Sequence, residues 1–339
     1  MEIVNLSPFS VASVPAITRE GVDVQVVCVS ARHDLDGSAT RGTPPSAEQG
    51  EPILEDVYWG EPGVSSLRME GQGIYERPGT DIVISGHACA PSEVPVSRLL
   101  LTVRVAELEQ RALVSGDRVW RRDAMGLVPS TPQPFSRLPL RYELAFGGRV
   151  DERSVIADNP IGCGWYSDAR AASGRPLPNI EDPDQPIAEL RDRPKPIGFC
   201  AIPRHWPARL RHAGTYDEAW MKTRMPFWPA DLDLRFFQAA SPGLVLERHL
   251  LGGEPISLTG FSATGPIAFP VPRNRLLLKS YFDGYEELVE MTADTLHIEP
   301  DDGRFTLYYR VAIARGAGPH EYLASVLRQM HEWENVGFD

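Results

Sequence analysis

A period of two in the hydrophobic residues, repeated along the chain, is the feature that most constrains its fold. Apolar and polar residues alternate through 22–28, 99–105 and 305–313. Such alternation is typical of strands that bury one face. Shorter segments of the same kind are 81–84, 118–120, 256–258, 267–271, 276–279 and 295–298. Helices do not alternate regularly with these strands, so we predict a mainly β protein with an antiparallel, sandwich-like architecture and long ordered loops.

Helices are expected to be rare, because 31 Pro and 29 Gly interrupt the 339 residues. One short helix is nevertheless predicted near the C-terminus. Pro319 stands where a first helical residue is favoured, and an apolar stripe follows at helical spacing. The stripe consists of Tyr322, Leu323, Val326, Leu327, Met330 and Trp333. We expect this helix to cover the edge of a sheet, with partner docking as the alternative.

Three regions follow from composition: a β-rich part at 1–140, an irregular part rich in Arg, Trp and Pro at 141–240, and a second β-rich part at 241–339. The alternative is that all three regions form one compact unit. The central region holds four of the seven tryptophans. A long irregular segment with that composition is not a linker, so we expect it to be ordered and to carry the function.

The charge balance disfavours two classes of partner. With 34 basic and 46 acidic residues the net charge is −12, which repels nucleic acid and anionic membranes. Four separate cysteines without a CxxC pair favour a reducing compartment. No Lys or Arg precedes Arg19, so the N-terminal segment is a poor match to an export signal. No uninterrupted apolar segment is long enough for a membrane helix. We therefore expect a cytoplasmic protein that binds neither nucleic acid nor membrane.

Motifs for cofactors are missing from the sequence. There is no HExxH, zinc-finger spacing, phosphate-binding loop or GxSxG. His87 and Cys89 share one face at a strand end, but a buried Cys and a partnered His are ordinary strand residues. We expect no metal, no cofactor and no catalytic residue.

Asp231 and Asp233 form the one pair of carboxylates with suggestive spacing. If the segment is extended, both share a strand face, which suits a general acid and base. A hydrolase using this pair with His205 or His212 is therefore the alternative function. Asp near proline also forms turns, caps and ion pairs, and we take this structural interpretation as the first choice.

The segment from Arg191 to Arg211 is the strongest local feature, with six basic residues and one acidic residue. Aromatic residues lie within it and after it, and Arg and Trp are frequent at the centres of protein interfaces. A surface that binds a partner is therefore predicted at Arg204, Trp206, Arg209, Arg211, Tyr216 and Trp220. The alternative is an internal network of ion pairs with Asp182, Asp184 and Asp217.

Ten motifs follow one another along the chain. They are ERPGTDIVISGHACAP (76–91), SGDRVW (115–120), PFSRLPLRYELAFGG (134–148), NPIGCG (159–164), LPNIEDP (177–183), PIGFCAIPRHWPAR (196–209), AGTYDEAW (213–220), PFWPADLDLRFF (226–237), LLGGEPISL (250–258) and ADTLHIEPDD (293–302). In this order they resemble domain-of-unknown-function family 2169, which is found beside type VI secretion genes. The resemblance covers the chain to about Arg315.

The resemblance implies a cytoplasmic accessory protein of Gram-negative bacteria, an adaptor or co-chaperone. Its partners would be a secreted effector, often PAAR-tipped, the VgrG spike or a second chaperone. The family's binding residues are not carried over, so the resemblance assigns no site. We expect a non-enzymatic type VI secretion adaptor.

Overall fold

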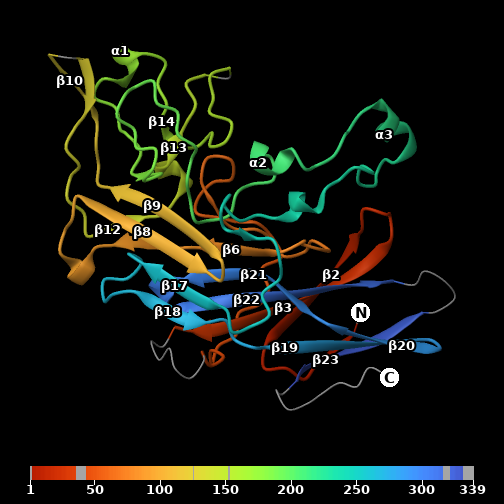
Figure 1. Ribbon diagram of the computed structural model, residues 1–339. Helices are drawn as coiled ribbons and strands as arrows, with labels where there is room; N and C mark the ends of the chain where they lie inside the picture. Colours follow the sequence, from red (N-terminus) through yellow and green to blue (C-terminus); the bar gives the residue numbers. More distant parts are fainter. Residues whose placement is uncertain (1, 36–42, 125, 152, 316–320, 331–339) are drawn as a thin grey trace.

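The computed structural model describes residues 2–35, 43–124, 126–151, 153–315 and 321–330. Its largest sheet has six strands in the order β16-β6-β21-β22-β3-β2 (Figure 1). These strands are β2 (Ser10–Ile17), β3 (Asp23–Asp34), β6 (Thr80–Ile84), β16 (Val245–Leu246), β21 (Thr292–Glu299) and β22 (Arg304–Ala314). All neighbours in it are antiparallel except β6 and β21.

Two further sheets complete the β framework. The five-stranded sheet has the order β15-β9-β8-β17-β18 and the four-stranded sheet the order β1-β23-β19-β20. Their strands are β1 (Ile3–Asn5), β8 (Arg98–Val105), β9 (Leu108–Ser115), β15 (Ile180–Glu181), β17 (Pro255–Thr259), β18 (Ile267–Pro270), β19 (Arg275–Phe282), β20 (Tyr285–Glu290) and β23 (Tyr322–Met330). The mainly β, mainly antiparallel fold is confirmed. The predicted strand at 118–120 agrees least with the structure, since Trp120 is its one residue that lies in a strand.

The predicted C-terminal helix is wrong, because Tyr322–Met330 forms β23. β23 pairs antiparallel with β19 and parallel with β1. Ser325 and Leu327, two positions apart, are both fully buried, as the period of a strand requires. The apolar stripe fits a helix and a strand, and pairing with two neighbours selects the strand. Pro319 and Trp333 lie outside the described residues.

Shorter elements cover one side of the sheets and build the central region. The short strands are β4 (Val57–Tyr58), β5 (Leu67–Met69), β7 (His87–Cys89), β10 (Trp120–Asp123), β11 (Gly126–Pro129), β12 (Arg137–Pro139), β13 (Phe146–Gly147) and β14 (Cys163–Gly164). The α-helices are α1 (Ala169–Ala172), α2 (Pro207–Leu210) and α3 (Glu218–Thr223), and the 3-10 turns are η1 (Pro91–Glu93), η2 (Tyr142–Leu144), η3 (Leu234–Phe237) and η4 (Pro300–Asp302). The main hydrophobic core joins residues of all three large sheets and of the central region, such as Val29, Val103, Leu327 and Phe199.

Candidate functional site

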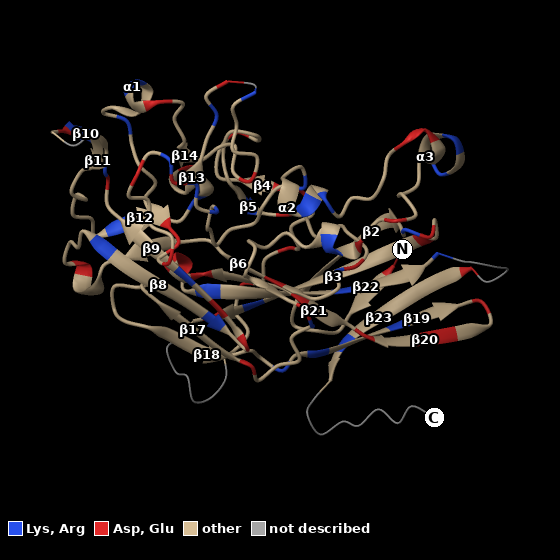
Figure 2. Ribbon diagram, turned by 45° about the horizontal axis from the view of Figure 1, so that its top comes forward, with Lys and Arg blue, Asp and Glu red and all other residues tan. Residues whose placement is uncertain are grey.

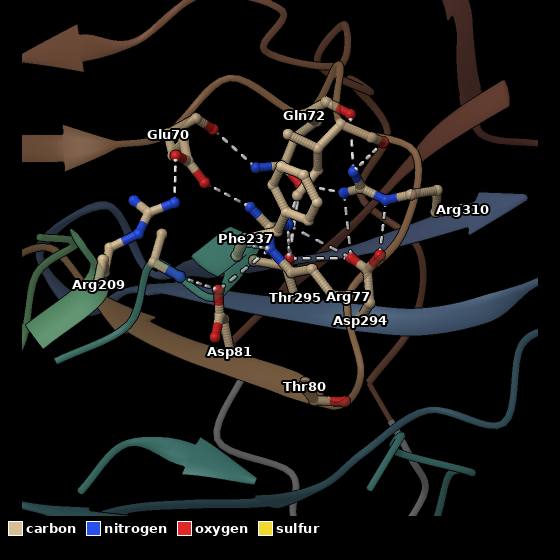
Figure 3. Close-up of polar contacts among 12 residues, drawn as sticks. Glu70, Gln72, Arg77, Thr80, Asp81, Arg209, Phe237, Asp294, Thr295 and Arg310 are labelled. Atoms are coloured by element: carbon tan, nitrogen blue, oxygen red, sulfur yellow. Dashed lines mark hydrogen bonds and ion pairs between the residues drawn. The ribbon is translucent and has the colours of Figure 1, made fainter. Parts of the chain in front are cut away.

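A cluster of buried charged side chains lies between the six-stranded sheet and the segments that cover it (Figure 3). Its members are Glu70, Arg77, Asp81, Arg209, Asp294 and Arg310. Each of these side chains is at most 2% exposed. Three arginines balance three carboxylates, and such balance is the condition for burying charge without a large penalty. We call this set the charge network.

Glu70, which follows β5, is the hub of the charge network. It accepts hydrogen bonds from Arg77 Nη2 at 2.9 Å, Arg209 Nη2 at 2.7 Å and Arg204 Nε at 2.7 Å. Burial alone would raise the pKa of Glu70, but the guanidinium groups of Arg209, Arg77 and Arg204 outweigh it and lower the pKa to about 2. Glu70 is therefore ionised and holds three arginines from two segments, Arg77 from one and Arg204 and Arg209 from the other.

Arg77 connects Glu70 to the strands beneath. Its guanidinium lies 3.2 Å from Asp81 and 3.5 Å from Asp294, and its Nε donates to Phe237 O at 2.9 Å. Asp81 Oδ2 accepts from the backbone N–H of Ala239 at 2.6 Å, whereas its Oδ1 has no hydrogen-bond partner among the residues that the structure describes. Burial is the largest influence on Asp81 and raises its pKa to about 6.

Arg310 fastens the segment 70–77 to β21 and β22. Its Nε donates to Asp294 at 2.6 Å, and its Nη1 donates to the carbonyls of Gln72 and Ile74 at 3.0 and 2.6 Å. Together with Arg77 this contact fixes a loop that has no regular structure of its own. The charge network thus lies beneath the loop 70–77 and holds it in place.

A groove of about 870 Å³ lies at the surface of this loop. Its lining comes from 15–17 of β2, 54–58 with β4, 71–75 above the charge network, 203–205 before α2, 226–228 and Phe237. Arg204 stands at its rim with 41% of its side chain exposed. Arg204 Nε donates to Glu70, and neither terminal nitrogen of Arg204 has a hydrogen bond to a residue that the structure describes. Both terminal nitrogens therefore remain as donors at the groove that Arg204 lines.

An arm, residues 214–228 with α3 near its tip, stands away from the sheets beside the groove (Figures 1 and 2). Asp217 caps α3 by accepting from Trp220 N at 2.8 Å. The Trp220 ring packs edge-on against Tyr216, with 4.7 Å between ring centroids, and its Nε1 donates to Phe227 O at 2.9 Å. These contacts hold the two sides of the arm together without a buried core of its own.

The arm exposes four large apolar or aromatic side chains close together in the sequence. Tyr216 is 50% exposed, Met221 56%, Met225 63% and Phe227 40%. Phe227 also lines the groove. Exposed apolar residues that gather beside a hollow are the pattern expected at an interaction site.

Two of the residues predicted for the partner surface lie inside the protein, so the prediction is wrong for them. Trp206 is 3% and Arg209 2% exposed. The Trp206 ring packs edge-on against Tyr142 at 5.0 Å, and Arg209 pairs with Glu70. Arg209 and its partner Glu70 are 139 positions apart in the sequence, so the composition of the basic segment does not indicate Glu70 as the partner.

The other four predicted residues reach the surface at different places. Arg204 lies in the groove, Tyr216 and Trp220 lie on the arm, and Arg211 is exposed and donates to His212. The predicted internal carboxylates have other contacts. Asp184 pairs with Arg111, Asp217 caps α3, and Asp182 Oδ1 accepts from the N–H of Asp184.

Asp231 and Asp233 lie in a turn and at the start of η3, and not in a strand. Asp231 accepts from the N–H and hydroxyl of Thr215 at 2.9 and 2.7 Å, which closes the base of the arm. Asp233 caps η3 and pairs with Arg235, and this hydrogen bond lowers the pKa of Asp233 to about 2. His212 lies 3.5 Å from Asp233, whereas His205 lines the groove.

Sequence reasoning missed most of the charge network, although a signal for it exists. Asp81, Asp294 and Arg310 each stand inside a strand whose residues are buried on both faces. A charge in such a strand needs a buried partner of opposite sign. The sequence does not reveal which partner each residue finds.

The described residues contain no group of three or more His, Cys, Asp or Glu side chains placed to hold a metal ion. Within the same residue ranges, no helix combines the length and the apolar character needed to cross a membrane.

The fold and the site define a mainly β, largely antiparallel protein with an arm beside a groove. The chain belongs to the DUF2169 family, described as an uncharacterized protein conserved in bacteria, whose family model matches residues 20–310. Neither curated proteins nor solved structures give a match.

Proposed function

We propose that the protein is a non-enzymatic adaptor that binds a partner protein with the groove and the arm. The observation that carries the proposal is the exposure of Met221, Met225 and Phe227 beside the groove. Methionine and aromatic side chains contribute strongly when a partner covers them, and methionine adapts to irregular partner surfaces.

Arg204 adds a polar anchor to this surface. Glu70 holds its Nε from below, so the guanidinium is oriented before a partner arrives. An arginine that is already oriented loses less conformational entropy when it binds a carboxylate. This arrangement supports recognition of a partner that presents an acidic residue to the groove.

The role in type VI secretion rests on the ten ordered motifs. On that basis the partner is a secreted effector, PAAR-tipped in some cases, and the adaptor assists its loading onto the VgrG spike in the cytoplasm, with or without a second chaperone. Membership of the DUF2169 family supports the kinship on which this role depends.

The test is affinity purification from the native cell with a tagged protein and two sets of variants. Met221→Ser together with Met225→Ser should reduce recovery of the partner at least about tenfold, which corresponds to about 1.4 kcal/mol. Leu251→Ser is the matched control, because Leu251 is 82% exposed and does not line the groove. Equal recovery with both variants would contradict the proposed surface, provided that both melt like the wild type.

A further inference from the structure

The β2–β3 ladder determines which backbone groups of β2 face β3 and which point away from the sheet. Thr18 N donates to Val22 O at 3.0 Å at the end of the hairpin, and the register continues through Ala16 with Val24 and Val14 with Val26. In an antiparallel pair, hydrogen-bonded and non-bonded pairs alternate. The backbone groups of even-numbered β2 residues therefore point to β3, and those of odd-numbered residues point away from the sheet.

Both ends of this outer edge are closed by side chains. At one end, Phe9 N donates to Ser7 Oγ at 3.3 Å and Phe9 O accepts from Asn5 Nδ2 at 2.7 Å. At the other end, Ile17 O accepts from Trp228 Nε1 at 3.2 Å, and Arg19 N donates to Tyr75 Oη at 3.1 Å.

The middle of the edge is open. The outward N–H groups of Val11, Ser13 and Ile17 and the outward carbonyls of Val11, Ser13 and Pro15 have no hydrogen bond to any residue that the structure describes. These residues span about 20 Å at roughly 3.4 Å per residue. Unpaired edge groups at this spacing match the backbone of another extended chain.

The usual protection of edge strands is weak here. Ser10–Ile17 contains no charged residue (Figure 2), although charges normally keep edge strands from pairing. Pro15 removes one outward donor, which limits pairing of β2 with a second copy of itself: a Val11 carbonyl opposite Pro15 would find no N–H. A strand from a partner protein can pair with β2 in a register that places no carbonyl group opposite Pro15.

The open edge is continuous with the groove. Pro15, Ala16 and Ile17 belong both to β2 and to the groove lining, which also includes Phe227 and Trp228 of the arm. In both views β2 lies on the side of the sheet that carries α3 (Figures 1 and 2). A strand added along β2 would therefore lead its chain from the sheet edge into the groove.

We propose that β2 accepts an extended segment of the partner protein as a seventh strand of the six-stranded sheet, and that the same segment continues into the groove. This inference rests on the proposed function, because it specifies how the adaptor holds its partner. The occupant is a stretch of about six residues with alternating side chains and little charge, since Ser10–Ile17 offers no charge to pair with.

The first experiment measures amide hydrogen exchange by NMR on the free protein. Ala12 and Val14, in the ladder, should exchange at least about a hundredfold more slowly than Val11 and Ser13. Equal protection of all four amides would overturn the inference, because the edge would already be covered. A concentration-dependent dimer with Val11 and Ser13 protected would overturn it in favour of a second copy.

The second experiment uses a defined probe, a seven-residue peptide of alternating Thr and Val with Lys at each end. At millimolar concentration it should shift the amide signals of Val11, Ser13 and Ile17, whereas the same peptide with its alternate amides N-methylated should not. An absence of shifts, or equal shifts with both peptides, would overturn the inference. This test needs no variant and no identified partner.

The third experiment compares Ser13→Pro with Ser13→Ala in partner recovery from the native cell. Proline removes the outward N–H but no bond to β3, and native Pro15 occupies an equivalent outward position. Ser13→Pro should lower recovery about tenfold or more, and Ser13→Ala should leave it unchanged. If Ser13→Pro does not fold, Ser13→Lys replaces it, because a charge also blocks edge pairing.

The outcomes separate the two proposals. A partner that is lost with the arm variant but retained with folded Ser13→Pro overturns the strand addition and leaves the adaptor proposal intact. Failure of the wild type to recover any specific partner contradicts the adaptor proposal, and the peptide titration still decides whether the β2 edge accepts a strand.

Discussion

Replacing Glu70 by Gln should destabilise the protein more than any change of similar size on its surface. The substitution preserves shape but leaves Arg77 and Arg209 buried with one carboxylate fewer. The pKa of Glu70 is about 2 in the folded protein against 4.5 for an unperturbed glutamate. At about 1.4 kcal/mol for each tenfold change, ionised Glu70 contributes roughly 3 kcal/mol. Removing one partner of a buried ion pair costs about 3 to 5 kcal/mol, in agreement with this value.

The stability lost on replacing Glu70 by Gln should depend on pH in a defined direction. Because the pKa of Glu70 is lower in the folded than in the unfolded protein, its contribution is complete above the unfolded value of 4.5 and is lost as the pH falls toward about 2. Glu70→Gln and the wild type should therefore differ most at neutral pH and converge in acid. Asp81 affects the pH dependence of stability in the opposite direction. Its pKa is raised from the ordinary value of 3.8 to about 6, so the folded protein loses stability as the pH rises through this range.

The assay is urea unfolding followed by circular dichroism and tryptophan fluorescence at several pH values. Glu107→Gln is the control, since Glu107 makes a surface ion pair with Arg248 and its loss should change little. A decrease below about 1 kcal/mol for Glu70→Gln at pH 7, no larger than that of ordinary surface changes, would refute the reasoning about the charge network.

Three further predictions follow from the placement of single residues. Arg209→Glu should prevent folding, because it puts a third carboxylate beside Glu70 and Asp81, whereas Arg211→Glu should fold normally; thermal melts compare the two. Asp231→Asn together with Asp233→Asn should lower the melting temperature and change partner binding only in proportion; a hydrolytic activity that disappears while stability is unchanged would instead support the hydrolase. Dialysis against a chelator should alter neither the melting temperature nor partner binding, and a loss that zinc restores would refute this.

The sequence predicts strands best where one face is buried, because burial then imposes a period of two. Residues 99–105 alternate both in sequence and in burial within β8. Residues 305–313 also lie in a strand as predicted, but β22 is buried on both faces and not on one. The helix predicted over Tyr322–Met330 is wrong because the apolar positions fit both periods, and only pairing with β1 and β19 decides between them.

The site is less predictable because it depends on contacts between distant segments. Trp206 and Arg209 are residue types that are frequent at interfaces. Arg209 is nevertheless buried, because it pairs with Glu70 from a distant segment. The open edge of β2 depends on the register with β3 and on side chains from residues 5, 7 and 228. Such arrangements are set by tertiary structure and leave no local pattern.

Photocrosslinking in the native cell tests the adaptor surface most directly. A photoreactive amino acid is placed at Met225 on the arm or at Ser13 on the β2 edge, and in a control at Leu251. We expect the first two positions to yield adducts with the same partner protein and the third to yield none. Adducts with that partner at Leu251 but not at Met225 or Ser13 would contradict the account.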